Sequence, residues 1–496
     1  MFMGIGFLSF IIFLPLIVSF VLLVLPVNTK VTRNIAFATT IVVFLLSLNI
    51  FFSFRLTDYM QFREFHPWIT SYGIYYSLGV DGFSMIILML ITTLIPLGYL
   101  FLWKSKKEKG YWASMLLIQT GVTGALLSLD MILFYFFWES MLLPVFMIIG
   151  IYGTGNRIFS TLKITIYTIM GSLFMLVSIL YLGVTFYNEF GVWSFQLSDL
   201  VQITTLSNFQ RTLLFFGFMI AFAIKIPIFP FHTWLKQTYS NSPTGGVFIL
   251  SAIMAKLGIY GIVRFVLPLF PHQYVEFAPY FVGLGVFGLI YFGIAAIMQQ
   301  NIKRMFAYSS ASHLALITAG IFSLNIYGMT GAAFLIVAHA MATGGLFLLA
   351  GTIEYDLGIR SISGLGGIAK KAPFLTVAFA LMIFSTVGLP GTNGFVSELL
   401  IVMGLFQYNH YVGIISASTV LVAASFMFWL FQRAILVDTK NDVSKMKDLD
   451  IKEIVGIFSL ASVIIAMGIY PHWFLYKIAP TLQHYLVDIL KVGVGS

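Results

Sequence analysis

Apolar stretches of about 20 residues recur along the whole chain, and they constrain its fold more than any other feature. A helix of about 20 residues crosses the hydrocarbon core of a bilayer. Only 9% of the 496 residues are charged, whereas soluble domains carry about 25%. The sequence therefore predicts an all-α polytopic membrane protein with about 14 transmembrane helices. We place the spans near residues 5–26, 35–54, 82–103, 112–129, 131–152, 160–187, 211–230, 246–269, 278–298, 305–322, 329–352, 373–406, 412–436 and 454–473.

Helix-breaking residues cluster in two of these spans. Pro227 and Pro230 follow each other closely at the end of the seventh span, and the letters LPG interrupt the unusually long twelfth span. Proline removes a backbone donor and kinks or ends a helix. Backbone groups freed at membrane depth are tolerated only where protein or a water-filled cavity satisfies them. We therefore expect helices 7 and 12 to be discontinuous, with water reaching the chain at each break.

The positions of the broken helices predict an internal repeat. Helix 12 follows helix 7 by an odd number of crossings, so two equivalent copies would have opposite orientations in the membrane. Inverted repeats around interrupted helices are a recurrent transporter architecture. The expected divisions are an N-terminal three-helix segment (1–111), a first five-helix repeat (112–270), a second, inverted repeat (271–436), and a last helix with an amphipathic tail (437–496). The tail itself, 474–496, is expected to lie along the membrane surface or against another subunit.

Basic residues gather in alternate loops and so predict the orientation of the chain. Cytoplasmic loops of membrane proteins carry an excess of Lys and Arg. Most of the 27 basic residues fall on one side of the predicted topology. The rule places that side inside and both termini on the outer, periplasmic face. The residues on the inner side are Lys30, Arg33, Lys104, Lys106, Lys107, Lys109, Arg157, Lys163, Lys236, Lys303, Arg304, Arg360, Lys370, Lys371, Arg433, Lys440, Lys445, Lys447 and Lys452.

Few ionisable residues remain inside the predicted spans, and all lie near mid-depth. An isolated charge at that depth costs at least ~2.5–3.5 kcal/mol on insertion scales. Such groups are expected to pair with one another or with water, and a row of buried acid, lysine and histidine groups is typical of a proton relay. These residues are Glu139, Lys225, Lys256, His313, His339 and Glu398.

The relay hypothesis gives Glu139 and Lys225 a particular role. A desolvated lysine loses its proton more readily, and an approaching carboxylate reverses this effect. The distance between the two side chains would therefore act as a switch. The alternative is an ion pair that only sets packing, although buried ion pairs stabilise less than apolar packing does.

Structural roles also remain open for three other residues. An intramembrane histidine often forms a helix–helix hydrogen bond, so His313 and His339 fit either a structural or a relay role. Arg264 lies near the outer end of its helix. We expect Arg264 to be structural and to extend its charged group to the membrane surface.

The chain contains no cysteine. This excludes disulfides, cysteine-ligated iron–sulfur clusters and covalently attached c-type haem. Any redox chemistry associated with the chain is therefore expected in a partner subunit.

Six sequence motifs, in their order and spacing, resemble the antiporter-like M-type subunits of bacterial NADH–quinone oxidoreductase (respiratory complex I), the counterparts of chain 4 of the mitochondrial enzyme. They are FFWESMLLPVFMIIGIYG, KIPIFPFHTWL, AKLGIYGIVRFVLPLFP, KRMFAYSSASHLALI, AHAMATGGLFLLAG and GLPGTNGFVSELL. The resemblance spans roughly residues 120–410. It implies fourteen helices, inverted repeats of helices 4–8 and 9–13, and one proton-translocating unit.

The resemblance also implies which residues carry the protons. The glutamate in helix 12 is informative, because the sister L-type and N-type subunits usually carry lysine there. The matching residues are the helix-5 glutamate (Glu139), the broken-helix lysine (Lys225), the helix-8 lysine (Lys256), two histidines of the central hydrophilic axis (His313 and His339) and the helix-12 glutamate (Glu398).

One segment departs from the family pattern. The family usually has WLP-x-AH-x-x-APT after the broken helix, and this chain has WLKQTYSNSPT. Lys236 replaces the proline, and Tyr239 replaces a histidine on the side from which protons are expected to enter. A histidine-based uptake route is therefore in doubt. His232 remains nearby as a candidate on the uptake side.

The expected function is that of a proton-pumping membrane-arm subunit of complex I in the bacterial inner membrane. Flavin, iron–sulfur clusters and quinone are expected in partner subunits, with L-type and N-type antiporter-like neighbours and no cofactor in this chain. No nucleic-acid patch is present; the net charge of +9 reflects membrane topology.

Alternatives remain at this stage. The chain could serve a ferredoxin-dependent complex I-like enzyme or a membrane-bound hydrogenase. It could also belong to a multi-subunit cation/proton antiporter that works without redox input. A stand-alone scaffold would leave the buried ionisable groups unexplained. Co-purification of flavin and iron–sulfur subunits would distinguish a redox complex from an antiporter.

Overall fold

The computed structural model describes residues 6–105, 107–438 and 443–493, with side chains through residue 487. Residue 5 of the first predicted span, Lys106, Lys440 and the end of the predicted tail (494–496) lie outside the described residues.

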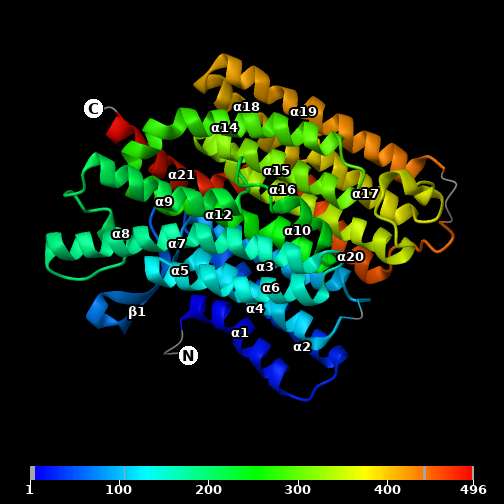
Figure 1. Cartoon of the computed structure of the whole chain (residues 1–496), viewed down its shortest axis with the longest axis horizontal. Helices are drawn as coiled ribbons and strands as arrows, with labels where there is room; N and C mark the ends of the chain where they lie inside the picture. Colours follow the sequence, from blue (N-terminus) through cyan, green and yellow to red (C-terminus); the bar gives the residue numbers. More distant parts are fainter. Residues whose placement is uncertain (1–5, 106, 439–442, 494–496) are drawn as a thin grey trace.

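Every predicted span has a helical counterpart (Figure 1). The helices are α1 (Phe7–Val24), α2 (Thr29–Ser53), α3 (Gly82–Phe101), α4 (Lys109–Leu127), α5 (Met131–Ser140), α6 (Leu142–Tyr152), α7 (Arg157–Phe190), α8 (Leu197–Leu200), α9 (Asn208–Lys225), α10 (Leu235–Asn241), α11 (Thr244–Ile249), α12 (Ala255–Gly261), α13 (Leu267–Leu269), α14 (Pro271–Ile297), α15 (Ile302–Ile321), α16 (Ile326–Leu357), α17 (Pro373–Thr386), α18 (Asn393–Tyr408), α19 (His410–Phe431), α20 (Ile451–Ile469) and α21 (His472–Gly493). Short 3₁₀ turns are η1 (Thr70–Tyr72), η4 (Ile362–Gly364) and η5 (Ile368–Lys370). Turns of π-helix are η2 (Leu250–Met254), η3 (Ile262–Val266) and η6 (Gln432–Leu436).

The described residues include 10 helical segments that are long and apolar enough to cross a membrane. The other predicted spans are the two broken ones and the helices α4 and α15. Both of these helices bury polar side chains within the bundle, including Gln119 and Thr120 in α4 and Ser309 and His313 in α15. Polar residues facing the protein interior lower the hydropathy of a helix without exposing it to lipid. The prediction of an all-α polytopic membrane protein is confirmed.

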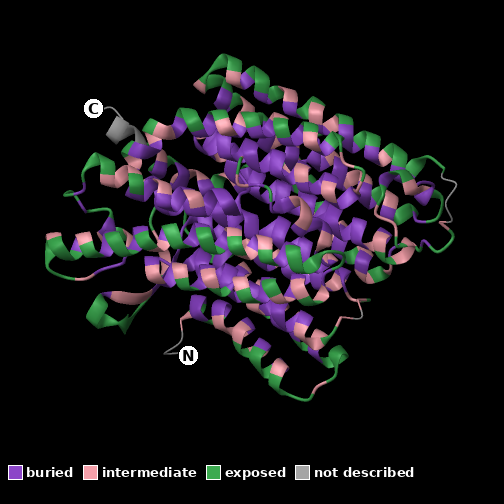
Figure 2. Ribbon diagram, in the orientation of Figure 1, coloured by how far each residue is buried: buried purple, intermediate pink, exposed green. Residues whose placement is uncertain are grey.

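The most buried helices occupy the centre of the bundle. The eighth span, Thr244–Leu269, and α16 are completely buried over their most apolar windows, and Figure 2 shows the buried residues concentrated there. Helices α1, α2, α7, α14 and α19 expose one face along the periphery. Helix α8 lies at the left end of the bundle in Figure 1, and the strand β1 lies at the lower left. The two helical segments that carry Lys256 and His339 therefore lie at the centre of the core.

A short hairpin between the second and third spans is the main element that sequence analysis missed. Strands β1 (Gln61–Ile69) and β2 (Ile74–Val80) pair in an antiparallel arrangement. Glu64 of β1 reaches the start of α1, where its carboxylate accepts hydrogen bonds from the backbone N–H of Leu8 at 2.5 Å and of Ser9 at 3.2 Å. An acidic group at this position accepts hydrogen bonds from the free N–H groups, and its negative charge interacts favourably with the positive end of the helix dipole. The hairpin is thus fixed to the first helix.

Substituting Gly6 by alanine should weaken this attachment. The backbone angles of Gly6, φ −67° and ψ 160°, suit any residue, but a Cβ there would overlap the carboxylate of Glu64. Displacing a buried carboxylate from its donors costs about 1–3 kcal/mol, so Gly6→Ala should lower the thermal unfolding midpoint of the purified protein. Gly283→Ala is the matched control, since its Cβ would meet nothing within 4 Å. Equal unfolding midpoints for the two variants would contradict the role of Glu64 in attaching the hairpin to α1.

The predicted C-terminal tail forms the single helix α21. Its apolar face packs against α3, α14 and α16 of the same chain, and Ile478 and Leu482 are buried there. Trp473 and Tyr476 are exposed on this helix. The buried face of the tail is therefore covered by helices of the same chain. Its place along the membrane surface or against another subunit stays a prediction.

Candidate functional site

Lys225 is the last residue of α9, where the first helix break begins. The turn that follows, 226–234, contains both predicted helix breakers. The indole Nε1 of Trp234 donates a hydrogen bond to the carbonyl of Ile224 at 3.1 Å, so an acceptor freed near the helix end is satisfied within the bundle. The predicted discontinuity of helix 7 is confirmed, and it leaves the Lys225 side chain buried at a helix end.

Glu139 lies at a break that sequence analysis did not predict. The fifth span is divided at Met141 into α5 and α6. Pro144 has no N–H and cannot donate to the carbonyl of Ser140, four residues earlier. Glu139 therefore stands one residue before the end of α5. This interruption is a single residue whose backbone stays helical (φ −72°, ψ −22°), so it is much slighter than the break after Lys225. The proline in the sequence is the signal that could have revealed it.

Glu139 and Lys225 are separated in this structure. Lys225 Nζ lies 4.7 Å from the centroid of the Trp138 ring, an arrangement that cation–π attraction favours. Glu139 Oε1 is buried without a hydrogen-bond partner. Within the described part of the chain, no ion pair of 4.0 Å or less joins the two groups. Each still acts on the other electrostatically.

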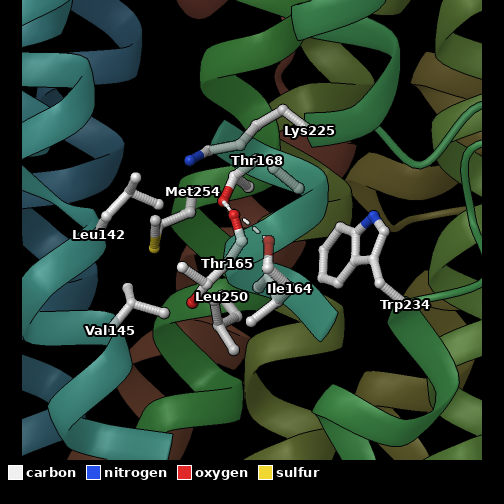
Figure 3. Close-up of a pocket in the computed structure, with 10 residues that line it drawn as sticks. Leu142, Val145, Ile164, Thr165, Thr168, Lys225, Trp234, Leu250 and Met254 are labelled. Carbon is white, nitrogen blue, oxygen red and sulfur yellow. Dashed lines mark hydrogen bonds between the residues drawn. The ribbon is translucent and has the colours of Figure 1, made fainter. Parts of the chain in front are cut away.

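A small cavity adjoins Lys225 (Figure 3). It offers about 20 Å³ to the centre of a water molecule, which is enough for one water. The ammonium nitrogen of Lys225 points toward Met254 and Thr168, with the Trp234 ring on the far side. Thr165 also lines the cavity. The site suits a water that would solvate the lysine, as expected at a broken helix.

Lys256 lies in α12, at the centre of the bundle and only 1% exposed. Its Nζ donates to the carbonyl of Ser251 and lies 3.0 Å from Nδ1 of His339 on α16. A π-turn precedes α12 (η2) and another follows it (η3). Turns of π-helix within α-helices are frequent at functional sites. The expectation that the buried ionisable groups pair with one another is met here, because the structure places His339 beside Lys256.

His339 and His313 lie side by side between Lys256 and Glu398. Their rings are stacked, with centroids 5.5 Å apart. His339 Nε2 is buried without a partner. His313 Nδ1 lies 2.9 Å from the carbonyl of Ser309, and its Nε2 lies 2.9 Å from the carbonyl of Thr386. Both contacts are with acceptors, so only a doubly protonated ring can donate to both.

Glu398 ends the row at the second helix break. Its Oε1 lies 3.3 Å from His313 Nε2, and its Oε2 faces the break, where a Cβ on Gly388 would lie only 2.7 Å away. Gly388 has φ +66°, a left-handed conformation that glycine adopts at no cost. The carbonyl of Thr386, at the end of α17, accepts from His313. The predicted break in helix 12 is confirmed, and it brings Glu398 to His313.

His232 occupies a separate position in the turn after α9. Its ring packs against Phe229, Tyr291 and Phe292, and its Nδ1 is buried without a partner. In the described structure no hydrogen bond or ion pair joins His232 to Lys225. Tyr239, which stands where the family has histidine, is fully buried with an unpartnered hydroxyl.

A cavity with several charged side chains opens where some of the predicted basic loops meet. It has about 530 Å³ and is lined by the loops after α3, α6 and α10, by the last turns of α16, and by residues at the start of α20 and in the loop before it. Lys303, which sequence analysis placed in a loop, lies in the first turn of α15 and is 2% exposed. It pairs with Glu354 at 2.5 Å, and Glu354 also binds Arg360. Burial lowers the pKa of Lys107 in the loop beside this cavity.

The fold and the buried row of ionisable groups define an antiporter-like membrane subunit. A family model described as NADH:quinone oxidoreductase/Mrp antiporter, TM, matches residues 128–425. The chain is 34% identical to NADH-quinone oxidoreductase subunit M of Rhodobacter capsulatus, over 99% of this chain and 98% of that protein. It is 35% identical to subunit M of Rickettsia prowazekii, over 97% and 98%. The chain belongs to the NADH:quinone oxidoreductase/Mrp antiporter family of membrane subunits.

A solved structure agrees with this assignment. One chain of the respiratory complex I of Thermus thermophilus with bound NADH superposes with a TM-score of 0.87. The two sequences are 26% identical, and the match covers 97% of this chain and 99% of that chain. The resemblance drawn from the sequence motifs is therefore confirmed over nearly the full length.

Proposed function

We propose that this chain is a proton-translocating, antiporter-like subunit of a NADH–quinone oxidoreductase, with no redox centre of its own. The observation that carries the proposal is the buried row that runs from Lys256 through His339 and His313 to Glu398. Every member can take up and release a proton, which a relay requires. Purely structural packing would not need four ionisable groups in succession.

The distances suggest the order of transfer. Lys256 would pass a proton to His339 Nδ1 across 3.0 Å, and His339 would release its other proton from the unpartnered Nε2. A water would connect the two rings, because stacked rings do not present N–H groups to each other. His313 would then donate to Glu398 across 3.3 Å. Protons would enter from the side of the basic loops and leave near Glu398.

The separated Glu139–Lys225 pair supplies the proposed input of energy. Quinone reduction in a partner subunit would draw the two groups together or release them. Contact with the carboxylate would hold the proton on Lys225, and separation would favour its release toward Lys256. In this proposal His232, which is buried beside α14, marks the uptake side.

The same proposal covers the assembly. The partners are other complex I membrane subunits, including L-type and N-type neighbours, and the subunits that hold flavin, iron–sulfur clusters and quinone. The chain would lie in a bacterial inner membrane with both termini outside. Residues 112–270 and 271–436 would form the inverted repeats, each with one broken helix.

Purification of the tagged chain from native membranes tests this function. The expected result is co-purification of flavin and iron–sulfur clusters, detected by fluorescence and electron paramagnetic resonance, together with NADH-driven quinone reduction. An untagged strain is the control. A complex without these cofactors that exchanges cations for protons would instead support the antiporter alternative. Activity with reduced ferredoxin but not NADH would point to a ferredoxin-dependent enzyme.

A further inference from the structure

Four polar side chains from distant parts of the chain form a closed, buried network. Arg264 Nη2 lies 2.7 Å from Asp81 Oδ1, and both side chains are about 1–2% exposed. Arg264 Nη1 donates to the Tyr485 hydroxyl at 2.5 Å, and this hydroxyl donates to Asp81 Oδ2 at 3.0 Å. Arg264 Nε donates to the Tyr260 hydroxyl at 2.8 Å. The expectation that Arg264 extends to the membrane surface is wrong, because its polar partners are inside.

The network joins four elements at one end of the eighth span. Asp81 caps the N-terminus of α3 and accepts from the Ser84 backbone N–H at 2.8 Å. Arg264 belongs to the π-turn η3, and Tyr485 belongs to α21. The Tyr260 hydroxyl donates to the carbonyl of Leu126 on α4 at 2.7 Å. The end of the helix that carries Lys256 is therefore held from three directions.

The spacing links this network to Lys256. Lys256, Tyr260 and Arg264 follow one another at intervals of four residues, so they lie along one side of the helix. The segment that contains Lys256 lies between two π-turns, each of which accommodates one extra residue and rotates the side chains that follow. The rotation of this segment about the helix axis must therefore be fixed by contacts at both of its ends. The Ser251 carbonyl and His339 hold one end, and Arg264 holds the other.

We propose that the Asp81–Arg264–Tyr485 network positions Lys256 for proton transfer to His339. This inference rests on the function proposed above. A buried ion pair contributes less stability than apolar side chains of the same size, and its better-attested use is to select one arrangement of the chain. The arrangement selected here is the rotation of α12 that brings Lys256 Nζ to Nδ1 of His339.

The double variant Asp81→Asn with Arg264→Gln tests the proposal in the assembled complex. Removing both charges together avoids leaving one buried charge unpaired. We expect the number of protons pumped per electron, normalised to assembled complex, to fall to about the value of Lys256→Ala. Arg433→Gln is the matched control, because Arg433 also lies in a π-turn but is exposed. Tyr485→Phe, which keeps the ring and removes one hydroxyl, should cause a smaller fall in the same direction.

Combining the network variants with Lys256→Ala separates positioning from a structural role. If the network acts through Lys256, it should have no further effect on the proton-to-electron ratio once Lys256 is absent. The positioning role would be overturned if both the double variant and Tyr485→Phe kept the ratio and the quinone reductase activity per assembled complex unchanged, whatever the yield of complex. Normal pumping by Lys256→Ala itself would instead overturn the proposed function. The two failures are therefore distinguishable.

Discussion

Glu139→Gln and Lys225→Ala should each abolish most of the proton pumping of the complex and the quinone reductase activity coupled to it, while assembly survives. Either change removes a titratable group from the point where energy is expected to enter the relay. A positioned acid or base contributes roughly 10²–10⁴-fold to the rate of a proton transfer. We therefore expect the rate of proton pumping to fall by at least about tenfold. Pumping in inverted membrane vesicles, normalised to complex content, measures the effect.

The geometry makes the conservative variant informative. Lys225 rests on Trp138 with no ion pair to Glu139, so the switch needs a carboxylate that can move toward the ammonium group. Glu139→Asp keeps the charge on a shorter side chain and should retain more activity than Glu139→Gln. Glu276→Gln is the control, since Glu276 is a half-exposed glutamate on α14. Normal pumping by both neutral variants would show that the pair is only structural.

Substitutions of Glu398 should impair pumping in a characteristic order. Glu398→Ala and Glu398→Gln remove the ionisable group beside His313 and should impair proton release strongly, by at least about tenfold if this group acts as a positioned base. Glu398→Lys restores an ionisable group of the kind that the sister subunits carry, and should leave partial activity. Proton-to-electron ratios of the three variants, normalised to assembled complex, give the order.

A carboxylate that only packed the helix break would give the opposite order. The isosteric Gln would then be harmless. Lysine would be the worst of the three, because it is longer and carries the opposite charge. It would also crowd Gly388, since a Cβ added to Gly388 would lie only 2.7 Å from Glu398 Oε2. Near-normal pumping with Gln and none with Lys would remove Glu398 from the relay.

Much of the fold was predictable because it depends on local chemistry. Spans follow from runs of apolar residues, and the breaks after Lys225 and before Glu398 follow from proline and glycine. The break at Met141 had the same kind of signal in Pro144. The π-turns around Lys256 have no comparable local signature; η2 packs against α16 and η3 packs against α9. The β1–β2 hairpin was missed because its anchor, Glu64, acts on a helix 55 residues earlier.

The candidate site was predictable as a set of residues but not as a connected row. Each residue can be identified singly, because an ionisable residue inside an apolar span is visible in the sequence before its partner is known. The partners themselves are distant, as His339 is 83 residues from Lys256. The same limit explains the error on Arg264, because Tyr485 lies 221 residues away. Without these contacts, an arginine near a helix end is expected to reach for the surface.

The number of protons pumped per electron by the assembled Lys256→Ala complex tests the central claim most directly. Lys256 begins the row, and His339 and His313 connect it to Glu398. The account predicts a clear fall in pumping, either in the ratio itself or through loss of the coupled quinone reductase activity, in a complex that assembles at its normal level. Unchanged pumping and unchanged activity in that complex would contradict it.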